Sequence, residues 1–364
     1  MENVRRIVVV GGGYAGLAAL AVLSHRRDVE LSLLDPEPGQ VLVTELVQAL
    51  DPDDDPGTHQ IAFADLFRHT AIRHHPVRVT RIMASRRQVA SDDGRLWSFD
   101  QLVLAPGSES AVPPHAGWTD HAWPLRRLED ALALRDCLAR ADDQRVAVVG
   151  AGLTGVEVAG RLSARHRVTL IEQSGQVLPG FGPGLSLYAA HHLSLAGVRI
   201  MTGAHIRAVG DGAIALDAEP PLPYDVLVWA GGQRAPGWIA DGDLIVGSDG
   251  YPVVDAWGRN QAGIYVAGDL WRVPGTRRPT PPTAQVAVLA GAFVGRTLLA
   301  ELDGASLPNP FAPRLQGLMV SLTPHHGVGW VRRGGIPIVG PGAAWAQRFA
   351  FRQYRRQVLE QFDR

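Results

Sequence analysis

Two glycine-rich segments of the chain have the residue types and the spacing that bind phosphate. Each contains three glycines in the order G-x-G-x-x-G: Gly11, Gly13 and Gly16 in the first segment, and Gly150, Gly152 and Gly155 in the second. The first glycine of such a segment makes a tight turn, the second lets the backbone approach a pyrophosphate, and the third lets a helix pack closely on a strand. The N-terminus of that helix then faces the anion. These residues predict the binding of two dinucleotides.

The elements that must position these glycines are repeated as well. Short runs of β-branched residues, typical of buried parallel strands, occur on both sides of each glycine turn: Arg6–Val10, Val29–Leu34, Arg145–Val149 and Val168–Ile171. In each pair the second strand is followed by an acid, Asp35 or Glu172, where a carboxylate accepts hydrogen bonds from an adenosine ribose. The predicted fold class is α/β, with two Rossmann-like dinucleotide-binding domains.

The second acid also bears on the choice of nicotinamide coenzyme. Glu172 would repel the 2′-phosphate of NADPH, and the following residues 173–176 contain no arginine to bind it. NADH is therefore expected in the second site. If the first site holds a flavin, one chain brings together a hydride donor and a hydride acceptor, which would explain the duplication.

Composition excludes several other classes of protein. The chain of 364 residues is long enough for two domains with cores of their own, and its net charge of −1 gives no overall attraction to nucleic acid. The single Cys137 cannot form an internal disulfide, and no metal is expected, because adjacent histidine side chains diverge. The lack of a signal peptide and of a long apolar stretch predicts a cytoplasmic protein. The acidic run 51–56 is expected to be a solvated loop without regular structure, because it contains two prolines.

Two further segments resemble motifs of the flavoproteins that bind two dinucleotides. GIYVAGDL, at 263–270, resembles the second flavin motif, whose aspartate contacts the ribityl chain, and FDQLVLAPGS, at 99–108, resembles the strand that crosses between the domains. The resemblance implies a glutathione-reductase-like fold with FAD in the N-terminal site. An NADH-binding domain (113–242) is then inserted into an FAD-binding domain (1–112 and 243–312), and 313–364 form a short C-terminal region.

The resemblance also implies which residues contact each coenzyme. The expected FAD contacts are Gly11, Gly13, Tyr14, Ala15, Gly16, Asp35, Val79, Ala105, Pro106, Gly107, Gly268, Asp269, Ala284 and Gln285. The expected NADH contacts are Gly150, Gly152, Leu153, Thr154, Gly155, Glu157, Glu172, Ala230, Gly231 and Gly232. Glu157, expected near the nicotinamide, and Gln285, in a helix whose N-terminus would stabilise reduced flavin, are the catalytic candidates. The alternative for both is an ordinary helix position.

Within this superfamily the chain resembles the type II NADH dehydrogenases, FAD enzymes that reduce membrane quinone. The segments that carry the resemblance are WPLRRLEDALALRD (123–136), GLTGVEVAG (152–160), VLVWAGGQRAP (226–236), PPTAQVAVLAG (281–291) and GLMVSLTPHHGVGWV (317–331). A lone cysteine excludes the disulfide reductases and the sulfide:quinone oxidoreductases. The implied reaction is hydride transfer from NADH to flavin N5, followed by electron transfer to a quinone.

Three positions depart from the pattern of the type II enzymes. Leu289 stands where the motif A-Q-x-A-x-Q ends in glutamine, Glu45 stands where proline is usual, and Leu20 fills a helix position usually held by alanine or glycine. Because of the change at 289, electron acceptors other than quinone remain as alternatives. The alternatives are a soluble NAD(P)H diaphorase, a reductase of an electron-carrier protein, and an NADH-binding redox sensor similar to apoptosis-inducing factor.

The C-terminal segment 343–364 is basic and rich in aromatic residues. Phe351, Tyr354, Val358 and Phe362 share one face of a predicted helix, which Arg355 interrupts. The resemblance implies peripheral contact with the inner face of the cell membrane. Packing on the protein's own core, or on a second copy in a homodimer, is the alternative.

Overall fold

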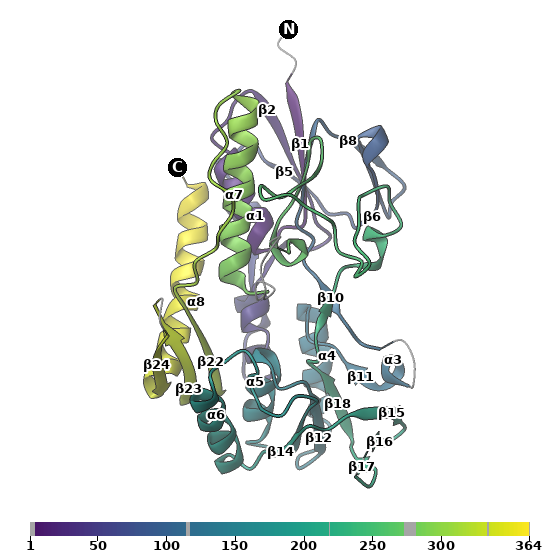
Figure 1. Cartoon of the computed structure of the whole chain (residues 1–364), viewed down its shortest axis with the longest axis vertical. Helices are drawn as coiled ribbons and strands as arrows, with labels where there is room; N and C mark the ends of the chain where they lie inside the picture. Colours follow the sequence, from purple (N-terminus) through teal and green to yellow (C-terminus); the bar gives the residue numbers. More distant parts are fainter. Residues whose placement is uncertain (1–3, 114–116, 218, 273–281, 333–334, 364) are drawn as a thin grey trace.

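The computed structural model describes residues 4–113, 117–217, 219–272, 282–332 and 335–363. A six-stranded sheet of order β20-β21-β9-β1-β2-β5 forms the centre of the N-terminal unit, the upper half of Figure 1. Its strands are β1 (Arg5–Val10), β2 (Val29–Leu34), β5 (Arg73–His75), β9 (Gln101–Leu104), β20 (Arg259–Gln261) and β21 (Ile264–Val266). Neighbouring strands are parallel except for β20 and β21.

Two helices, α1 (Tyr14–Leu23) and α7 (Ala284–Leu302), pack on this sheet and on each other. α1 is apolar on all sides and largely buried, and Leu20 is fully buried in it. Gly291 permits the close contact of the helices, because a Cβ there would lie 2.0 Å from the carbonyl oxygen of Ala15. By length and composition α7 could cross a membrane, but half of its apolar stretch is buried inside the structure.

Shorter elements complete this unit or join it to the second one. The antiparallel ribbon β6 (Val79–Met83), β7 (Gln88–Ser91) and β8 (Leu96–Ser98) contributes side chains to the same core. The others are β3 (Gly39–Val41), β4 (Gln60–Ala62), α2 (Phe63–Leu66) and the 3₁₀ helices η1 (Val43–Glu45), η2 (Gln48–Leu50), η3 (Pro56–His59), η4 (Ala84–Arg86), η5 (Gly237–Ile239) and η6 (Gly268–Leu270).

The inserted unit, the lower half of Figure 1, contains a parallel sheet of order β11-β18-β12-β13-β14. Its strands are β11 (Ala122–Trp123), β12 (Arg145–Val149), β13 (Arg167–Glu172), β14 (Arg199–Thr202) and β18 (Val226–Trp229). Its other elements are α3 (Trp118–His121), α4 (Leu128–Leu138), α5 (Leu153–Leu162), α6 (Pro183–Leu195), β15 (Ile206–Gly210), β16 (Ala213–Leu216) and β17 (Leu222–Pro223).

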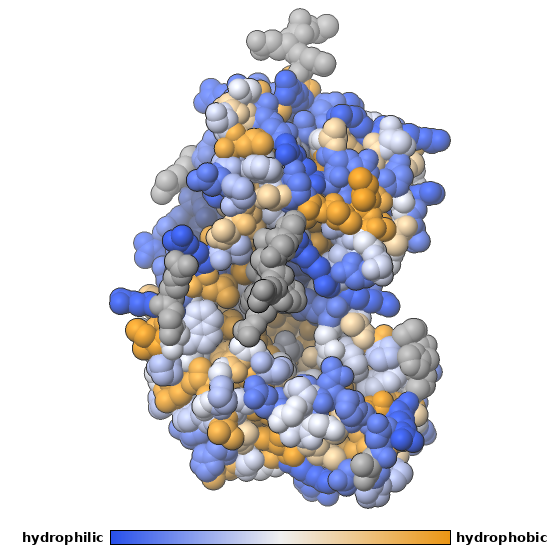
Figure 2. All heavy atoms as spheres, in the orientation of Figure 1, coloured by the Kyte–Doolittle hydropathy of each residue, from blue (hydrophilic) through white to orange (hydrophobic). Residues whose placement is uncertain are grey.

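The chain enters and leaves the inserted unit through two strands that pair with each other. β10 (Glu109–Ser110) follows β9, β19 (Gln233–Arg234) follows β18, and the two form an antiparallel ribbon between the units. Figure 2 shows a recess in the surface between the two halves on this side of the molecule. The predicted fold class, two Rossmann-like units with one inserted into the other, is confirmed.

The C-terminal region packs along both units. The antiparallel sheet β22 (Gly317–Thr323), β23 (His326–Val331) and β24 (Ile336–Gly340) is followed by α8 (Pro341–Phe362). β22 lies directly on α5 at Gly160, where a Cβ would be 1.5 Å from the carbonyl oxygen of Leu322. Close packing of this strand therefore requires a glycine at position 160.

The acidic run 51–56 is irregular from 51 to 55 and exposes Asp53 and Asp55, as its composition predicts, but two of its aspartates make specific contacts. Asp51 forms an ion pair with Arg161 of α5, and Asp54 pairs with the fully buried His59 at 2.5 Å. Pro56 begins the 3₁₀ helix η3 rather than preventing regular structure, because proline is compatible with the first turn of a helix. The preceding residues Leu46, Val47, Ala49 and Leu50 belong to the hydrophobic cluster of the inserted unit. This segment joins the two units.

Candidate functional site

The two glycine turns have nearly the same backbone geometry. Gly11 has a φ of 94° and Gly150 a φ of 96°, values that side chains disfavour. A Cβ on Gly11 would lie 2.3 Å from the carbonyl oxygen of Ala105, and one on Gly150 would lie 2.6 Å from that of Ala230. Each turn therefore packs against the chain segment that follows a neighbouring strand, Ala105–Gly107 after β9 or Ala230–Gly232 after β18. The structure brings these predicted contact residues together in two separate cradles.

The other glycines of each cradle have the expected surroundings. A Cβ on Gly16 would lie 1.8 Å from the oxygen of Gly11, and one on Gly155 would lie 1.7 Å from that of Gly150. A Cβ on Gly13 or Gly152, in contrast, would have no described atom within 4 Å of it. These two glycines are the N-caps of α1 and α5, and neither helix has a side-chain cap or an acid in its first turn. This combination leaves space and free N–H groups for a pyrophosphate, so both cradles fit a dinucleotide.

The two acids fasten the glycine turns to the strands beside them. Asp35 accepts hydrogen bonds from the backbone N–H of Gly12 (2.6 Å) and of Glu37 (2.8 Å). Glu172 repeats the arrangement with Ala151 (2.7 Å) and Ser174 (2.8 Å). Burial raises the pKa of Asp35, and the two backbone donors oppose that rise. Each carboxylate retains lone pairs that a ribose could use, so its loop contact and its predicted ribose contact are compatible.

A polar network that the sequence did not indicate surrounds Asp269. The carboxylate accepts hydrogen bonds from the hydroxyl of Ser108 (2.7 Å) and from Arg126 (3.1 Å). Arg126 also donates to the Ser108 hydroxyl at 2.6 Å, and Gln233 lies 2.8 Å from that hydroxyl. These residues come from four distant segments, including both crossings between the units. Only the fold brings them together. Ser108, Arg126 and Gln233 lie in segments that carry the family resemblance, but none of the three was predicted as a contact residue.

The start of α7 meets the N-terminal cradle. Gly268 has a φ of 71°, and a Cβ there would lie 3.0 Å from the Cβ of Ala15 and 3.9 Å from that of Ala287. Ala284 is the first residue of α7, and the side chain of the following Gln285 accepts a hydrogen bond from the backbone N–H of Gln316 at 2.9 Å. The side-chain carbonyl of Gln285 therefore holds the segment that leads into β22. Its predicted role toward a flavin stays a prediction.

Glu157 lies in an enclosed environment beneath the C-terminal region. Its carboxylate accepts hydrogen bonds from the side-chain N–H of Gln347 (2.5 Å) and from the backbone N–H of Ser321 (3.2 Å). Burial raises its pKa to about 7, although both hydrogen bonds lower it. A buried carboxyl with such a pKa can gain or lose a proton near neutral pH. Its predicted position beside the nicotinamide stays a prediction.

Several predicted contact residues lie at the ends of the elements around the cradles. Tyr14 opens α1, its hydroxyl hydrogen-bonds to Thr44 at 2.8 Å, and burial raises its pKa to about 12. Leu153 and Thr154 form the first turn of α5, where Thr154 is exposed. Val79 is a buried residue at the start of β6.

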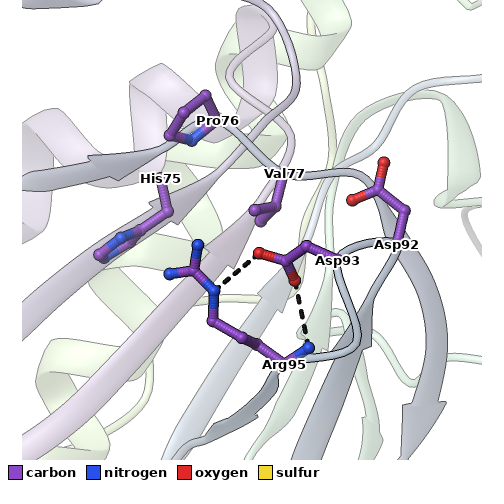
Figure 3. A pocket seen from close by; sticks show the side chains of 6 residues that line it. All are labelled: His75, Pro76, Val77, Asp92, Asp93 and Arg95. Atoms are coloured by element: carbon purple, nitrogen blue, oxygen red, sulfur yellow. Dashed lines mark hydrogen bonds and ion pairs between the residues drawn. The ribbon is translucent and has the colours of Figure 1, made fainter.

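A separate polar cavity of about 390 Å³ lies between the end of β5 and the turn from β7 to β8 (Figure 3). Its lining residues are His75, Pro76, Val77, Asp92, Asp93 and Arg95. The arginine is already paired with Asp93 at 2.7 Å. None of the residues predicted to contact a coenzyme lines this cavity, so it is distinct from both cradles.

Two phosphate cradles on two parallel sheets, joined by paired crossings, define the class of oxidoreductases that bind two dinucleotides. A sequence profile described as pyridine nucleotide-disulphide oxidoreductase matches residues 5–291. The chain belongs to this family.

Relatives and solved structures agree with the resemblance seen in the sequence. A type II NADH:quinone oxidoreductase of Staphylococcus saprophyticus is 27% identical, over 95% of this chain and 94% of the relative. An NADH dehydrogenase-like protein of Mycobacterium tuberculosis is 31% identical over 63% of each chain. The structure of NDH2 from Plasmodium falciparum in complex with NADH superposes with a TM-score of 0.87 at 14% identity, covering 99% of this chain and 97% of that one.

Proposed function

We propose that the chain is an FAD-dependent NADH:quinone oxidoreductase of the type II NADH dehydrogenase kind. The observation that carries the proposal is the pair of equivalent cradles, with Gly13 and Gly152 both open and the acids Asp35 and Glu172 both in place. The names of the full-length relatives support the same activity. Bound FAD would supply the acceptor for a hydride from NADH and pass the electrons on to the second substrate.

The protein's contribution to this reaction is binding and alignment. In the N-terminal cradle, Gly11, Gly13 and Gly16 shape the pyrophosphate site. Hydrogen bonds from Ser108 and Arg126 orient the carboxylate of Asp269, which would bind the polyol chain of the flavin. In the inserted cradle, Glu172 favours a ribose with a free 2′-hydroxyl over one with a 2′-phosphate. The raised pKa of Glu157 lets it hold a proton near pH 7, which suits a residue close to a reaction that consumes protons.

Quinone is the proposed acceptor, and Leu289 is where the acceptor site differs from the family pattern. This side chain is 37% exposed on α7, one turn beyond Gln285. An apolar residue here can contact the apolar part of a quinone but cannot hydrogen-bond to its carbonyl groups. We therefore expect the chain to turn over with quinone, but to bind the quinone with fewer hydrogen bonds than an enzyme that has glutamine at this position.

We also propose a peripheral contact with the inner face of the membrane through the C-terminal region. The inner face of α8 packs on the protein, since Val358 and Phe362 are buried in the core of the N-terminal unit. The outer face instead exposes the stacked pair Trp345 and Phe349, at 56% and 48%, and β24 exposes Ile336. Apolar side chains are visible over this region at the left of Figure 2. Such an arrangement is typical of an interfacial helix.

Rapid mixing of the purified flavoprotein with NADH under anaerobic conditions tests the activity. We expect the flavin absorbance band to bleach within milliseconds to seconds and to recover when a water-soluble quinone is added. Bleaching only over minutes would favour a redox sensor. Recovery with ferredoxin or rubredoxin, but not with quinone, would favour a reductase of electron-carrier proteins.

The membrane contact needs a separate test, because removing α8 would uncover the core residues beneath it. Replacing Trp345 and Phe349 by serine changes only the exposed face. We expect this double variant to lose co-sedimentation with anionic lipid vesicles while it retains its flavin. Equal sedimentation of the variant and the wild type would contradict the proposed contact.

A further inference from the structure

One helix, α8, lies along both units at the left of Figure 1. Its buried residues lie on one face of the helix and form one stripe: Ala343, Ala344, Gln347, Val358 and Phe362. The first part of the stripe packs on β23 and β22, which lie on α5 and α6 of the inserted unit. The last part reaches the core of the N-terminal unit. A single rigid element therefore bridges the two units.

At its inserted-unit end, α8 is fixed by a buried polar contact. Gln347 donates to the carboxylate of Glu157 at 2.5 Å, and its carbonyl side is hydrogen-bonded to the hydroxyl of Ser321. The Gln347 side chain is buried, and both of its polar ends are used. Because unpaired buried polar groups are costly, these bonds set the position of the helix on α5 and β22.

At the other end, α8 is fixed by contacts beside the N-terminal cradle. Arg355 pairs with Glu45 at 2.7 Å, and the Glu45 side chain is only 7% exposed. The hydroxyl of Tyr354 accepts a hydrogen bond from Gln40 at 2.6 Å. The ring of Tyr354 lies 4.8 Å from that of Tyr14, the residue that directly follows Gly13. The second anchor is therefore in contact with the first turn of α1.

The contacts at the two ends restrict movement of one cradle relative to the other. The ion pair of Arg355 and Glu45 is buried only on the Glu45 side, since the arginine side chain is 30% exposed. Such a pair adds little net stability compared with an apolar pair, but removing the arginine leaves the buried carboxylate of Glu45 without its partner. Transfer between two bound coenzymes is sensitive to geometry, since a displacement of about 1 Å can cost about 100-fold in rate. A helix anchored on both cradles is suited to prevent such a displacement.

We propose that α8 is a strut that holds the two dinucleotide cradles in fixed relative positions, with Gln347 and Arg355 as positioning residues for hydride transfer. The inference rests on the proposed function. It assigns to the inner face of α8 a role separate from the membrane contact of the outer face.

Substitutions at the two anchors test the strut, and the same helix provides a matched control. The test variants are Arg355→Leu, Gln347→Leu and the exchanged pair Glu45→Arg with Arg355→Glu. The control is Arg356→Ala, because Arg356 lies on the outer face and pairs with Glu360 of the same helix. For each protein, the bound FAD, the Kd for NADH, the thermal midpoint and the rate constant of flavin reduction at saturating NADH are measured.

We expect Arg355→Leu and Gln347→Leu to lower the rate constant of flavin reduction by about tenfold or more. Bound FAD and the Kd for NADH should stay within about threefold of the wild type, which separates positioning from loss of binding. The exchanged pair should recover most of the rate, and the control should behave as the wild type. If the anchor variants lower only the thermal midpoint and leave the rate unchanged, α8 is merely structural and the proposal is overturned.

Hydrogen exchange provides a readout that does not depend on turnover. Without NADH, we expect faster exchange at the crossings 105–112 and 230–236 in the anchor variants than in the control. If the wild-type flavin is not reduced by NADH, the proposed function fails, but faster exchange would still support the strut. Unchanged exchange in both anchor variants would overturn the strut whatever the activity. If Arg355→Leu fails to fold, Gln347→Leu at the opposite end decides the matter.

Discussion

The two cradles have the same backbone and different surroundings. Their first glycines differ by only 2° in φ, at 94° and 96°. The helix of the N-terminal cradle begins with Tyr14, which is covered by Thr44 and by Tyr354 of α8, and its second residue Ala15 is buried. The helix of the inserted cradle has the exposed Thr154 at that second position. Among the described residues, the first turn of the helix is therefore covered in the cradle that we assign to FAD and exposed in the one that we assign to NADH.

This difference shows how one binding device can serve two kinds of coenzyme. The glycine turn supplies N–H groups and space in both cases. Whether the coenzyme stays or leaves is decided by what covers the turn. A prosthetic group is retained beneath other elements of the protein, whereas a coenzyme that must leave after each turnover needs an open path. The predictions below test this division.

The largest effect is expected when the third glycine of either cradle is replaced. A Cβ would lie 1.8 Å from the oxygen of Gly11 in Gly16→Ala and 1.7 Å from that of Gly150 in Gly155→Ala, and such overpacking costs about 1–3 kcal/mol. We expect Gly16→Ala to be purified without flavin. Gly155→Ala should keep its flavin but be reduced by NADH at least about tenfold more slowly. Absorbance spectra and rapid mixing measure both effects. Loss of flavin from Gly155→Ala would contradict the assignment of the two cradles.

The cradles could be predicted from the sequence because they are local structures. Each consists of a strand, a turn and a helix that follow one another along the chain, and steric demands at Gly11 and Gly150 permit few residue types. The acids Asp35 and Glu172 were recognisable for the same reason, since each ends the next strand. Their contacts with the turn were not predicted, because a sequence pattern does not show which lone pairs the backbone uses.

The contacts of α8 could not be predicted, because they join residues that are far apart in the sequence. Arg355 interrupts the apolar face of a predicted helix, and Glu45 departs from a family pattern. In the structure, each is the partner of the other. The acidic run 51–56 illustrates the same limit. Its polarity could be read from the sequence, but the ion pair of Asp51 with Arg161 of the other unit could not. A charged residue in a sequence is expected to be exposed, and Glu45 is buried because a distant residue, Arg355, pairs with its charge.

A second prediction concerns coenzyme choice in the cradle that we assign to NADH. Glu172→Ala combined with Gln173→Arg removes the charge that repels a 2′-phosphate and adds one that attracts it. We expect the ratio of kcat/KM for NADH over NADPH to fall by about tenfold or more, which corresponds to about 1.4 kcal/mol. The control is Asp35→Asn in the cradle that we assign to FAD, which should weaken FAD retention without changing this ratio. An unchanged ratio in the double variant would show that Glu172 does not face the ribose.

The third prediction concerns pH and Glu157, which lies between α5, β22 and α8. Burial raises its pKa from 4.5 to about 7, so between these values the native state binds a proton that the unfolded state has released. The free energy of unfolding must therefore fall as pH rises through this window, by roughly 3 kcal/mol in total. Glu157→Gln should lack this decline. Urea denaturation of both proteins at pH 5 and pH 8 measures it, and parallel pH profiles would refute it.

The smallest effect is expected at Leu289, on the acceptor side of the cradle that we assign to FAD. Leu289→Gln restores the amide of the family motif, and because the residue is 37% exposed, the substitution should not disturb packing. One added hydrogen bond contributes about 0.5–1.5 kcal/mol, so reoxidation by a water-soluble quinone should become about two- to tenfold faster. Reduction by NADH should not change, since that coenzyme binds in the other cradle. If the substitution alters reduction by NADH and leaves reoxidation unaffected, Leu289 contacts the nicotinamide side of the flavin. The assignment of the acceptor to this side would then be wrong.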